Sequence, residues 1–558
     1  MNADWLLGLY DRIADAPDAV GRLRRFVLDL AVRGKLVPQD PADEPASELL
    51  ERIAKEKARL VKAGEIRTEK PLPPIAEADK SYDSPDGWKW VRLGDLSKLV
   101  TSGSRDWAQH YSNDGAIFVR MGNLSKNHYR LRLDHIQRVN APNDGEGTRT
   151  RLEAGDILVS ITGEVGMLGL IPEGFGEAYI NQHTALVRSM PAMKGRYIAE
   201  LFRSPFAQNQ FNEPQRGIKN SFRLTDVTQF VVPLPPLAEQ HRIVAKVDEL
   251  MALCDRLEAA RAEREATRDR LAAASLARLN APDPETFTDD ARFALNALPA
   301  LTTRPDQIKQ LRQTILNLAV RGKLVPQDPT DEPASELLRR RKITGAGLGP
   351  FNLPGSWTWV NVGAVAKARL GKMLDKAKNK GKPRRYLRNI NVRWFDFDLS
   401  DLFEMPFEDS ELPEFALRSG DVLICEGGEP GRAAVWDARE KDIYFQKAIH
   451  RVRFPVGVDP YFFVRSLRAS AEDGRLERYF TGTGIQHFTG RGLDAYLFPL
   501  PPLAEQHRIV AKVDELMALC DQLEANLTTG DATRRRLLDA LLTEALTPAT
   551  TRNLEAAE

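Results

Sequence analysis

The chain has 558 residues, of which 42% are hydrophobic and 28% charged, and its formal net charge is +1. This composition is typical of several packed domains, and the balanced charge excludes a general attraction to nucleic acid, so any polyanion must meet local basic patches or a partner protein. No apolar run reaches the roughly 20 residues of a membrane span, and the first residues lack a signal-peptide pattern. We therefore expect a cytoplasmic protein without membrane contact. The three cysteines lack metal-ligand spacing.

The N-terminal region, residues 1–80, carries a short apolar stripe with helical spacing. Its "LAVRGKLVPQDP" at 30–41 returns unchanged at 318–329, together with a second stripe. Successive prolines are expected to end both helices, because they remove donors and clash with the preceding turn. The stripe residues are Leu23, Val27 and Leu30 in the first copy and Leu311, Ile315 and Leu318 in the second.

Two segments, residues 81–235 and 346–500, are rich in glycine and short β-like runs. Strand-like runs mixed with helical ones predict a compact α+β domain in each. The segments share a scaffold, since "GDILVSITGEVG" at Gly155 is matched by "GDVLICEGGEPG" at Gly420, but they differ in most polar letters. Both begin with two alternating tryptophans, which are expected to pack against the domain rather than stack on bases. The four are Trp88, Trp90, Trp357 and Trp359.

The remaining regions, residues 236–345 and 501–558, each begin with a long helical pattern. "PLPPLAEQHRIVAKVDELMALCD" occupies residues 233–255 and 499–521, letter for letter. Its apolar residues alternate at steps of four and three, which is the seam of a coiled coil, and the first copy is expected to run as one rod from Ala238 to Leu279. The seam residues are Ile243, Val247, Leu250, Cys254 and Leu257, repeated as Ile509, Val513, Leu516, Cys520 and Leu523.

The order of globular segment, "PLPPLAEQHRIV", long helix, "LAVRGKLV", second segment and second "PLPPLAEQHRIV" resembles the specificity subunits of Type I restriction-modification enzymes. The resemblance implies two α+β target recognition domains in pseudo-twofold repeat, separated by long antiparallel coiled-coil helices. One "LAVRGKLV" precedes the first domain, so the order looks permuted. The pseudo-symmetry survives if the short helix at 23–30 packs on the C-terminal helix, as that at 311–318 would on the central one.

The resemblance also implies a function. Each recognition domain would read one half of a bipartite, asymmetric site in double-stranded DNA. The helices would separate the two domains and dock two methyltransferase subunits, and restriction subunits would join to form the nuclease. The chain itself would be non-catalytic and hold no cofactor, with S-adenosylmethionine, ATP and Mg²⁺ bound by the partner subunits.

The residues themselves offer little catalytic equipment. The sequence has no "GxxxxGK[ST]" phosphate loop and no adenine-methyltransferase motif. Asp156 with Glu164, and Asp421 with Glu429, faintly suggest a metal-dependent nuclease, but no lysine follows two residues after either glutamate. Glu239 in "EQHR" stands in the first turn of a helix, where it is expected to favour the helix dipole rather than to act with the histidine.

Basic residues gather at 366–389, where ten of twenty-four are Lys or Arg and one is acidic. Such a run can neutralise DNA phosphates, although it can also be a solvated loop. Arg and Asn suit paired hydrogen bonds to guanine and adenine, and Arg120 and Asn123 align with Arg388 and Asn391. The structural alternative is an internal arginine and a turn-forming asparagine.

We therefore predict DNA contacts in both globular segments, including glycine-bearing loops late in each. In the first segment they are Ser102, Ser104, Arg105, Arg120, Asn123, Lys126, Arg130, Lys219 and Asn220. In the second they are Lys372, Lys376, Lys378, Lys380, Arg384, Arg385, Arg388, Asn391, Gln486, His487 and Arg491. Two other functions stay open from the residues alone: a stand-alone DNA-binding regulator, and a coiled-coil adaptor whose globular segments bind protein.

Overall fold

The computed structural model describes residues 8, 16 and 18–546, with gaps at 69, 104–105, 142–144, 194, 213–220, 282, 284, 344–346, 376–378 and 456. The chain divides into two compact units. Unit 1 is Met1–Glu263 with Asp531–Glu558, and unit 2 is Arg264–Gly530. Within the described residues, every helix is too short or too polar to cross a membrane.

Two long helices supply the framework of both units. The helices α9 (Leu237–Asn280) and α18 (Leu503–Leu546) have 44 residues each, and each begins in one unit and ends in the other. The predicted continuous rod is confirmed, because the charged "RAEREATRDR" is made largely of good helix formers. The seam is confirmed as well. Its fully buried members are Ile243, Val247, Leu250 and Cys254 in unit 1, and Ile509 in unit 2.

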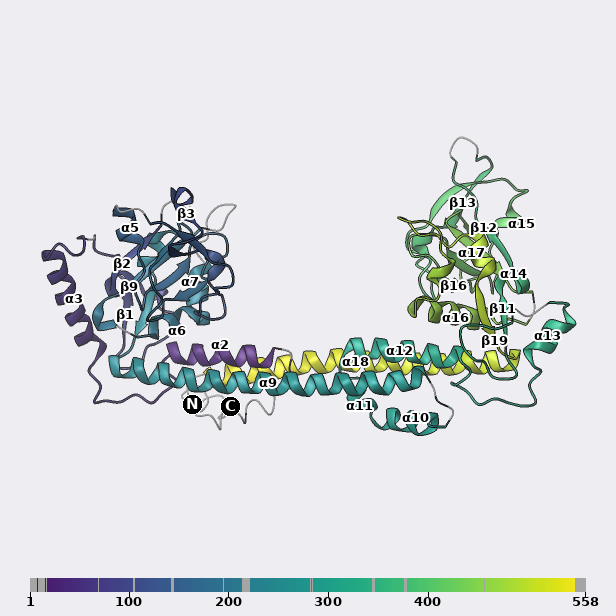
Figure 1. The fold of residues 1–558 in the computed structure, drawn as a ribbon, viewed down its shortest axis with the longest axis horizontal. Coiled ribbons are helices and arrows are strands. Elements are labelled where there is room, and N and C mark those ends of the chain that lie inside the picture. Colours follow the sequence, from purple (N-terminus) through teal and green to yellow (C-terminus); the bar gives the residue numbers. More distant parts are fainter. Residues whose placement is uncertain are drawn as a thin grey trace, which may run out of the picture. The chain divides into compact units, whose positions relative to one another are not determined.

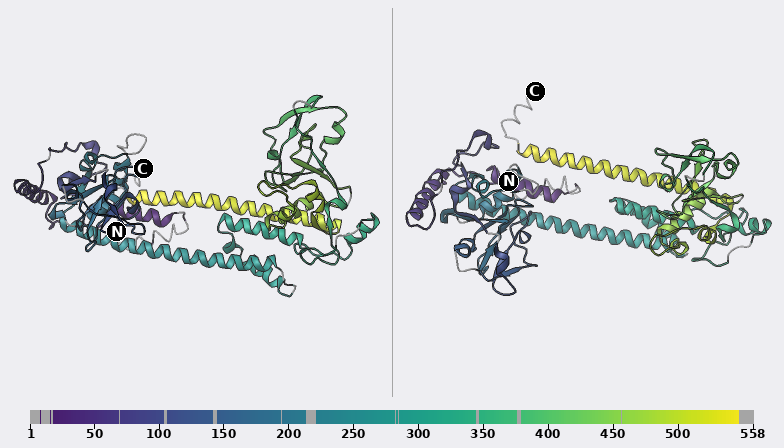
Figure 2. Two further views of the ribbon diagram at one scale, coloured as in Figure 1. Left: turned by 45° about the horizontal axis from the view of Figure 1, so that its top comes forward. Right: turned by 90° about the horizontal axis from the view of Figure 1, so that it is seen from above.

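The short helices α2 (Ala19–Val32) and α12 (Pro305–Val320) pack into these seams. In unit 1, Leu23 and Val27 of α2 share a core with the α9 seam and with Leu538 near the end of α18 (Figure 1, Figure 2). In unit 2, Ile315 of α12 packs on the α18 seam, and Leu311 also contacts the last turns of α9. The predicted packing of α2 on the C-terminal helix is confirmed, and each short helix also packs on the other long helix.

Matched ion pairs accompany this packing. Arg24 of α2 lies 2.7 Å from both Asp255 and Glu258 of α9. In unit 2, the counterpart Arg312 of α12 lies 2.7 Å from Asp521 and 2.8 Å from Glu524, both on α18. Because these side chains are partly exposed, each pair adds little to stability, but the pairs show that both copies of the repeat fold in the same register.

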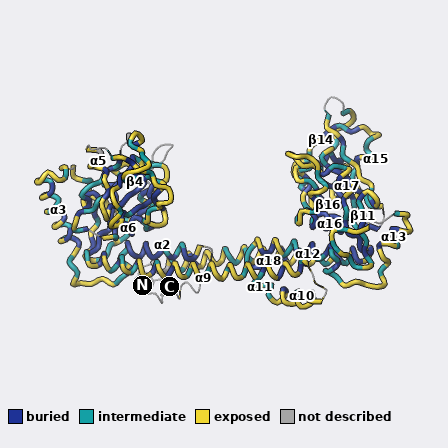
Figure 3. The backbone as a smooth tube through the Cα atoms, in the orientation of Figure 1, coloured by how far each residue is buried: buried dark blue, intermediate teal, exposed yellow. Residues whose placement is uncertain are grey.

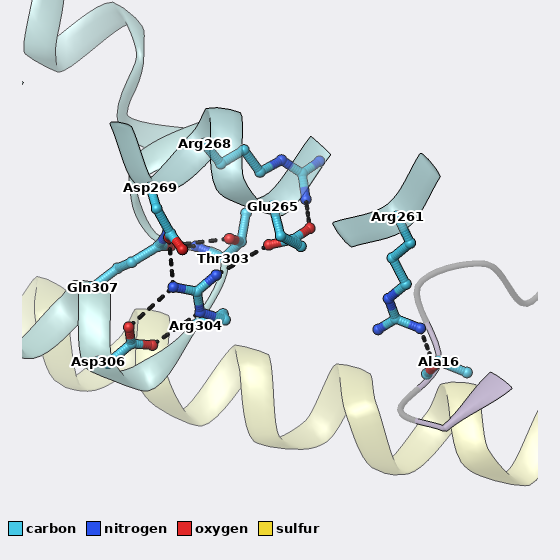
Figure 4. Close-up of polar contacts among 9 residues, drawn as sticks. All are labelled: Ala16, Arg261, Glu265, Arg268, Asp269, Thr303, Arg304, Asp306 and Gln307. Carbon is cyan, nitrogen blue, oxygen red and sulfur yellow. Dashed lines mark hydrogen bonds and ion pairs between the residues drawn. The ribbon is translucent and has the colours of Figure 1, made fainter. Parts of the chain in front are cut away.

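Unit 2 has an additional anchor where α12 begins. Arg304 lies 3.1 Å from Glu265 and 2.5 Å from Asp269, both on α9 (Figure 4). The repeat places Ala16 at the corresponding position of unit 1, where its carbonyl accepts a hydrogen bond of 3.1 Å from Arg261. The start of α12 is therefore held to α9 by ion pairs, whereas at the start of α2 the hydrogen bond from Arg261 accompanies apolar packing of Ala16 and Ala19 in the core.

Glycines, rather than prolines, end the two short helices. Both helices stop before the first proline that follows, at a glycine in the left-handed conformation: Gly34 with φ of 67° and Gly322 with φ of 66°. A Cβ on Gly34 would lie 2.3 Å from Cγ of Pro85, and one on Gly322 would lie 2.5 Å from Cγ of Pro354. The predicted cause of termination was therefore wrong. Only glycine allows both the left-handed turn and the close approach to the prolines Pro85 and Pro354.

Each unit carries a mixed α+β domain of the same design (Figure 1). In unit 1 the strand orders are β1-β10, β2-β9-β6-β7 and β3-β5-β4-β8. The strands are β1 (Lys89–Arg92), β2 (Ser97–Ser102), β3 (Tyr111–Ser112), β4 (Ala116–Val119), β5 (Gln137–Val139), β6 (Ile157–Ser160), β7 (Leu168–Leu170), β8 (Ala178–Ile180), β9 (Thr184–Ser189) and β10 (Val231–Leu234). The helices are α3 (Ala46–Lys62), α4 (Leu93–Leu96), α5 (Gly145–Thr150), α6 (Tyr197–Arg203), α7 (Pro205–Asn212) and α8 (Leu224–Thr228).

In unit 2 the strand orders are β11-β19, β12-β18-β15-β16 and β14-β13-β17. The strands are β11 (Thr358–Asn361), β12 (Lys367–Leu370), β13 (Lys382–Leu387), β14 (Phe403–Phe407), β15 (Val422–Cys425), β16 (Ala433–Val435), β17 (Tyr444–Phe445), β18 (Ile449–Arg453) and β19 (Leu497–Leu500). The helices are α10 (Phe287–Asn296), α11 (Leu298–Leu301), α13 (Ala334–Arg340), α14 (Val362–Val365), α15 (Leu412–Phe415), α16 (Pro460–Glu472) and α17 (Gly490–Ala495). All residues of β6 and β15 are buried, so these strands lie within the domain cores. The backbone coloured by burial shows buried segments inside both domains (Figure 3).

A buried carboxylate joins each α+β domain to its long helix. Glu239 in the first turn of α9 is 1% exposed, and its two oxygens accept hydrogen bonds of 2.9 Å from the indole N–H of Trp88 and 2.7 Å from the amide of Gln39. In unit 2, Glu505 accepts the matching hydrogen bonds of 2.9 Å from the indole N–H of Trp357 and 2.5 Å from the amide of Gln327. The structural interpretation of "EQHR" is confirmed, but the helix dipole is not the main reason for the glutamate.

Neighbouring contacts strengthen this joint. In unit 1, Arg242 pairs with Asp43 at 2.5 Å, and the hydroxyl of Tyr197 donates to the carbonyl of Pro233 at 2.6 Å. The predicted packing role of the tryptophans is confirmed too, since Trp88, Trp357 and Trp359 are buried and Trp90 packs against Phe206 and Tyr82. Each domain is thus fixed to the first turns of its own long helix.

Replacing Glu239 by Gln should loosen unit 1 alone. The amide keeps one acceptor oxygen, so one of the two buried donors loses its partner, at a cost of about 1–3 kcal/mol. Hydrogen exchange on the full chain should then show amides of β1 and the start of α9 exchanging about 5- to 150-fold faster, with unit 2 unchanged. The matched control, Glu505→Gln, should give the mirror result. Equal loosening of both units by either variant would contradict separate joints.

The joint should also depend on pH in a defined direction. Burial raises the pKa of Glu239 and of Glu505, more than their hydrogen bonds lower it. The carboxyl group of Glu239 or Glu505 therefore binds its proton more tightly in the folded protein than in the unfolded chain. The stability contributed by this protonation is present at low pH and is lost as pH rises through the folded pKa. The free-energy difference between the wild-type protein and Glu239→Gln should be larger near pH 4 than near pH 7. A difference that grows with pH would contradict the raised pKa.

Candidate nucleic-acid interface

Five loops of the first recognition domain meet at one end of its sheets. They follow β2 and β4, connect β6 to β7 and β8 to β9, and precede α8. The amide of Gly103 donates to the carbonyl of Asn181 at 3.2 Å, and that of Ile161 donates to the carbonyl of His183 at 2.9 Å. The amide of Phe222, before α8, donates to the carbonyl of Ile161 at 2.8 Å. The turn between β8 and β9 is therefore held between the loops on either side of it.

The second recognition domain brings the matching loops together with the same kind of backbone bonds. The amide of Lys447 donates to the carbonyl of Lys372 at 2.9 Å, and the amide of Glu426 donates to that of Ala448 at 2.9 Å. The amide of Phe488, before α17, donates to the carbonyl of Glu426 at 2.7 Å. The convergence of loops is thus a property of the shared scaffold rather than of either domain's own side chains.

An open cavity lies among these loops in each domain, of about 560 Å³ in the first and about 530 Å³ in the second. The first cavity lies between the loop after β4 and the turn between β8 and β9, whereas the second lies between the loops after β12 and β15, the turn between β17 and β18, and the loop before α17. The first cavity is lined by Arg120, Met121, Gly122, Asn123, Arg132, Asp134, His135, Asn181 and His183. The second is lined by Met373, Leu374, Glu426, Gln446, Lys447, Ala448 and His487.

Many of the predicted DNA contacts are accessible. The exposed side chains are Lys126, Arg130, Lys380, Arg385, Gln486, His487 and Arg491. Ser102, Arg120 and Arg384 are half-buried. The predicted residues Ser104, Arg105, Lys219, Asn220, Lys376 and Lys378 lie outside the described residues. Two of the exposed cations have acidic neighbours: Lys126 lies 3.6 Å from Glu164, and Arg385 lies 3.0 Å from Glu440.

Two of the three predicted asparagines, Asn123 and Asn391, have structural roles. Asn391 is 2% exposed; its Oδ1 accepts from the Arg388 amide at 2.9 Å, and its Nδ2 donates to the carbonyls of Asp398 and Asp401 at 2.9 and 3.1 Å. Asn123 makes the same three kinds of bond, to the Arg120 amide and to two backbone carbonyls. In this conformation neither amide has a donor left for a base, so the turn-forming alternative describes their geometry.

Two predicted cations are likewise engaged inside the second domain. Arg388 donates to the Asp401 carboxylate at 2.6 Å, and its guanidinium lies 3.7 Å from the centre of the Phe403 ring. Lys372 is 8% exposed; its ammonium lies 2.5 Å from Glu411 and 4.9 Å from the ring of Phe407. These contacts shape the loops after β12 and β13 rather than present a charge to the cavity.

The acidic residues that suggested a nuclease are held in ion pairs. Asp156 is 1% exposed and lies 2.7 Å from Arg188, and Asp421 pairs with Arg453 at 2.5 Å in the same position of the second domain. Among the described residues, no cluster of three or more His, Cys, Asp or Glu side chains is arranged to hold a metal. The repeated Asp–Arg pair accounts for these acids, because a buried carboxylate needs a partner.

The comparisons with known proteins agree with this architecture. The profile of the Type I restriction modification DNA specificity domain matches residues 85–265 and 354–529. The chain is 30% identical to the specificity subunit of the Type I restriction enzyme EcoAI and 29% identical to that of EcoEI, both from Escherichia coli, covering 94% of each chain. The HsdS subunit from Thermoanaerobacter tengcongensis is 20% identical, with 83% of this chain and 98% of that chain covered and a TM-score of 0.45.

The chain therefore belongs to the family of Type I restriction-modification specificity subunits. Its two α+β domains are the two target recognition domains of that family. The long helices α9 and α18 follow them directly in the chain.

Sequence reasoning missed the turns at the centre of the two loop clusters. These are Gln182 with His183 between β8 and β9, and Lys447 with Ala448 between β17 and β18. A signal was present: "YINQHTALVR" and "YFQKAIHRVR" align without a gap, and their polar letters change in the middle. The helices α3 and α13 were missed as well, although both begin with "ASELL".

Proposed function

We propose that each recognition domain reads one half of a bipartite, asymmetric site in double-stranded DNA, through the end at which its five loops meet. One observation carries the proposal: the same backbone hydrogen bonds bring the loops together in both domains, with an open cavity beside the central turn of each, while the side chains on the loops differ. A rigid framework with exchangeable side chains suits two readers of two different words. Exposed cations of the two domains would hold the DNA phosphates, chiefly Lys126, Arg130, Lys380, Arg385 and Arg491.

The long helices would dock two methyltransferase subunits and set the separation of the two domains. The outward face of the 23-residue repeat supports this role. Its exposed residues are identical in the two copies, although packing within the chain does not require them to be. The exposed residues include Ala245, Glu249 and Ala252 in the first copy, and Ala511, Glu515 and Ala518 in the second. One surface presented twice would bind two copies of one partner.

Restriction subunits would join this assembly in the cytoplasm to form the nuclease. The chain would contribute recognition and no catalysis, and S-adenosylmethionine, ATP and Mg²⁺ would be bound by the partner subunits. A stand-alone regulator would bind its site tightly without a methyltransferase, and a coiled-coil adaptor would leave DNA modification independent of the globular domains. Membership of the specificity-subunit family favours neither the regulator nor the adaptor.

Exchanging one recognition domain should alter one half of the modified site. Replacing residues 354–498 by the corresponding segment of a relative keeps Glu505 and Gln327, and a segment with tryptophan at the position of Trp357 would restore the joint, so the new domain should be held as the old one was. Sequencing of methylated bases in cells with the partner subunits should find one half-site changed and the other retained. A change in both halves, or in neither, would contradict independent readers.

Removing charge beside the second cavity should weaken DNA binding without changing its sequence preference. Replacing Lys380 and Lys382 by Ala should lower affinity for all sequences and reduce the slope of log affinity against log salt by about 2, since each neutralised phosphate contributes roughly 0.9. The matched control replaces two exposed lysines of α3, Lys55 and Lys62, by Ala, and should leave the slope unchanged. An unaltered slope in the first variant would place this strand away from the DNA backbone.

A further inference from the structure

Glycines fix the backbone of the central turn in both recognition domains. A Cβ on Gly103 would lie 2.3 Å from the carbonyl oxygen of Ile180, and one on Gly371 would lie 2.2 Å from that of Gln446. The loop after β2, or after β12, therefore rests directly on the turn, and only glycine permits that approach. The two turns are held so closely that a change of side chain should not move the backbone.

Hydrogen bonds place the two turns in the same register. The Ile161 amide donates to the carbonyl of His183, and the Glu426 amide donates to that of Ala448, both at 2.9 Å. His183 thus corresponds to Ala448, and the residue before it, Gln182, corresponds to Lys447. A polar amide and an ammonium stand at equivalent points of two matched frameworks; Lys447 lines the second cavity, and the residues on either side of Gln182 line the first.

The first turn is further ordered by its histidine. The Nδ1 of His183 lies 2.6 Å from the hydroxyl of Thr162, and its Nε2 lies 3.0 Å from the Nε2 of Gln182. If the Gln182 amide donates to Nε2, then Nδ1 carries the proton and donates to Thr162. His183 therefore orients the Gln182 amide, which keeps its carbonyl oxygen and one N–H for another partner.

The second turn offers a charge in place of the amide. Lys447 is exposed, and within the described part of the chain it has no ion-pair partner. The neighbouring candidates are engaged, since Arg388 pairs with Asp401 and Asn391 uses both amide N–H groups inside the domain. Lys447, which lines the second cavity, and the half-buried Gln182, which lies between two lining residues of the first, thus keep polar groups that are able to bind DNA.

We propose that these two turns determine the sequence specificity of the two domains, with Gln182 reading an adenine and Lys447 reading a guanine. Gln can bond N6 and N7 of adenine in pairs, and Lys can donate to O6 and N7 of guanine, each in the major groove. His183 acts as a positioning residue for Gln182. The proposal rests on the proposed function, because it assumes that this end of each domain faces DNA.

Two single substitutions test it in the full complex with its methyltransferase subunits. Gln182→Lys should change one adenine of one half-site to guanine, and Lys447→Gln should change one guanine of the other half-site to adenine. Discrimination at that position should shift by about 5- to 150-fold in competition binding against duplexes that carry each base at each position. The matched control, Lys441→Gln before β17, removes the same charge and should leave both half-sites unchanged.

The possible outcomes distinguish a failure of the proposed function from a failure of the assignment of the two turns. If the wild-type complex methylates no defined sequence, the proposed function fails. If it methylates a bipartite site and both variants keep the wild-type preference at every position, the assignment of these turns fails while the proposed function stands. An affinity loss spread evenly over all base positions would also overturn the assignment, because it would make Lys447 a phosphate contact. His183→Ala should weaken discrimination at the Gln182 position and leave the salt dependence unchanged.

Discussion

The buried carboxylate of Glu239, with its counterpart Glu505, is the contact on which the rest of the structure depends. A carboxylate placed at 1% exposure is costly unless both oxygens have donors, and Trp88 and Gln39 supply them from opposite sides of the joint. The tryptophan belongs to the recognition domain, the glutamine to the segment after α2, and the glutamate to the long helix. One side chain therefore decides how three pieces of each unit meet.

Because the same joint recurs in both units, the chain can vary its readers without altering how they are held. The Asp–Arg pairs behind the sheets and the glycines beneath the central turns also recur. The side chains on the loops near the cavities differ between the two domains. Gln182 and Lys447 stand on equivalent backbone, and their chemistry suits different bases. In the proposed assignment, the residues that determine specificity are therefore different from those that hold the fold together.

Periodic patterns in the sequence predicted the long rods, their seams and the two α+β domains, because apolar spacing reports directly on packing. Single residues whose roles depend on distant partners were not predictable. Glu239 looks like an ordinary first-turn glutamate until Trp88, 151 positions away in sequence, is placed beside it. Gly34 ends a helix for which the prolines seemed sufficient, since its close neighbour Pro85 is remote in sequence. Asn391 looked like a base reader because its carbonyl partners could not be foreseen.

The central claim is that two matched frameworks hold two unlike readers. The most direct measurement is sequencing of methylated bases in DNA from cells that carry this chain with its methyltransferase subunits. The account predicts two half-sites with different words, separated by a gap of fixed length. A single uninterrupted site would contradict two separate readers. Two identical half-sites in inverted order would contradict unlike readers, because the turns Gln182–His183 and Lys447–Ala448 differ.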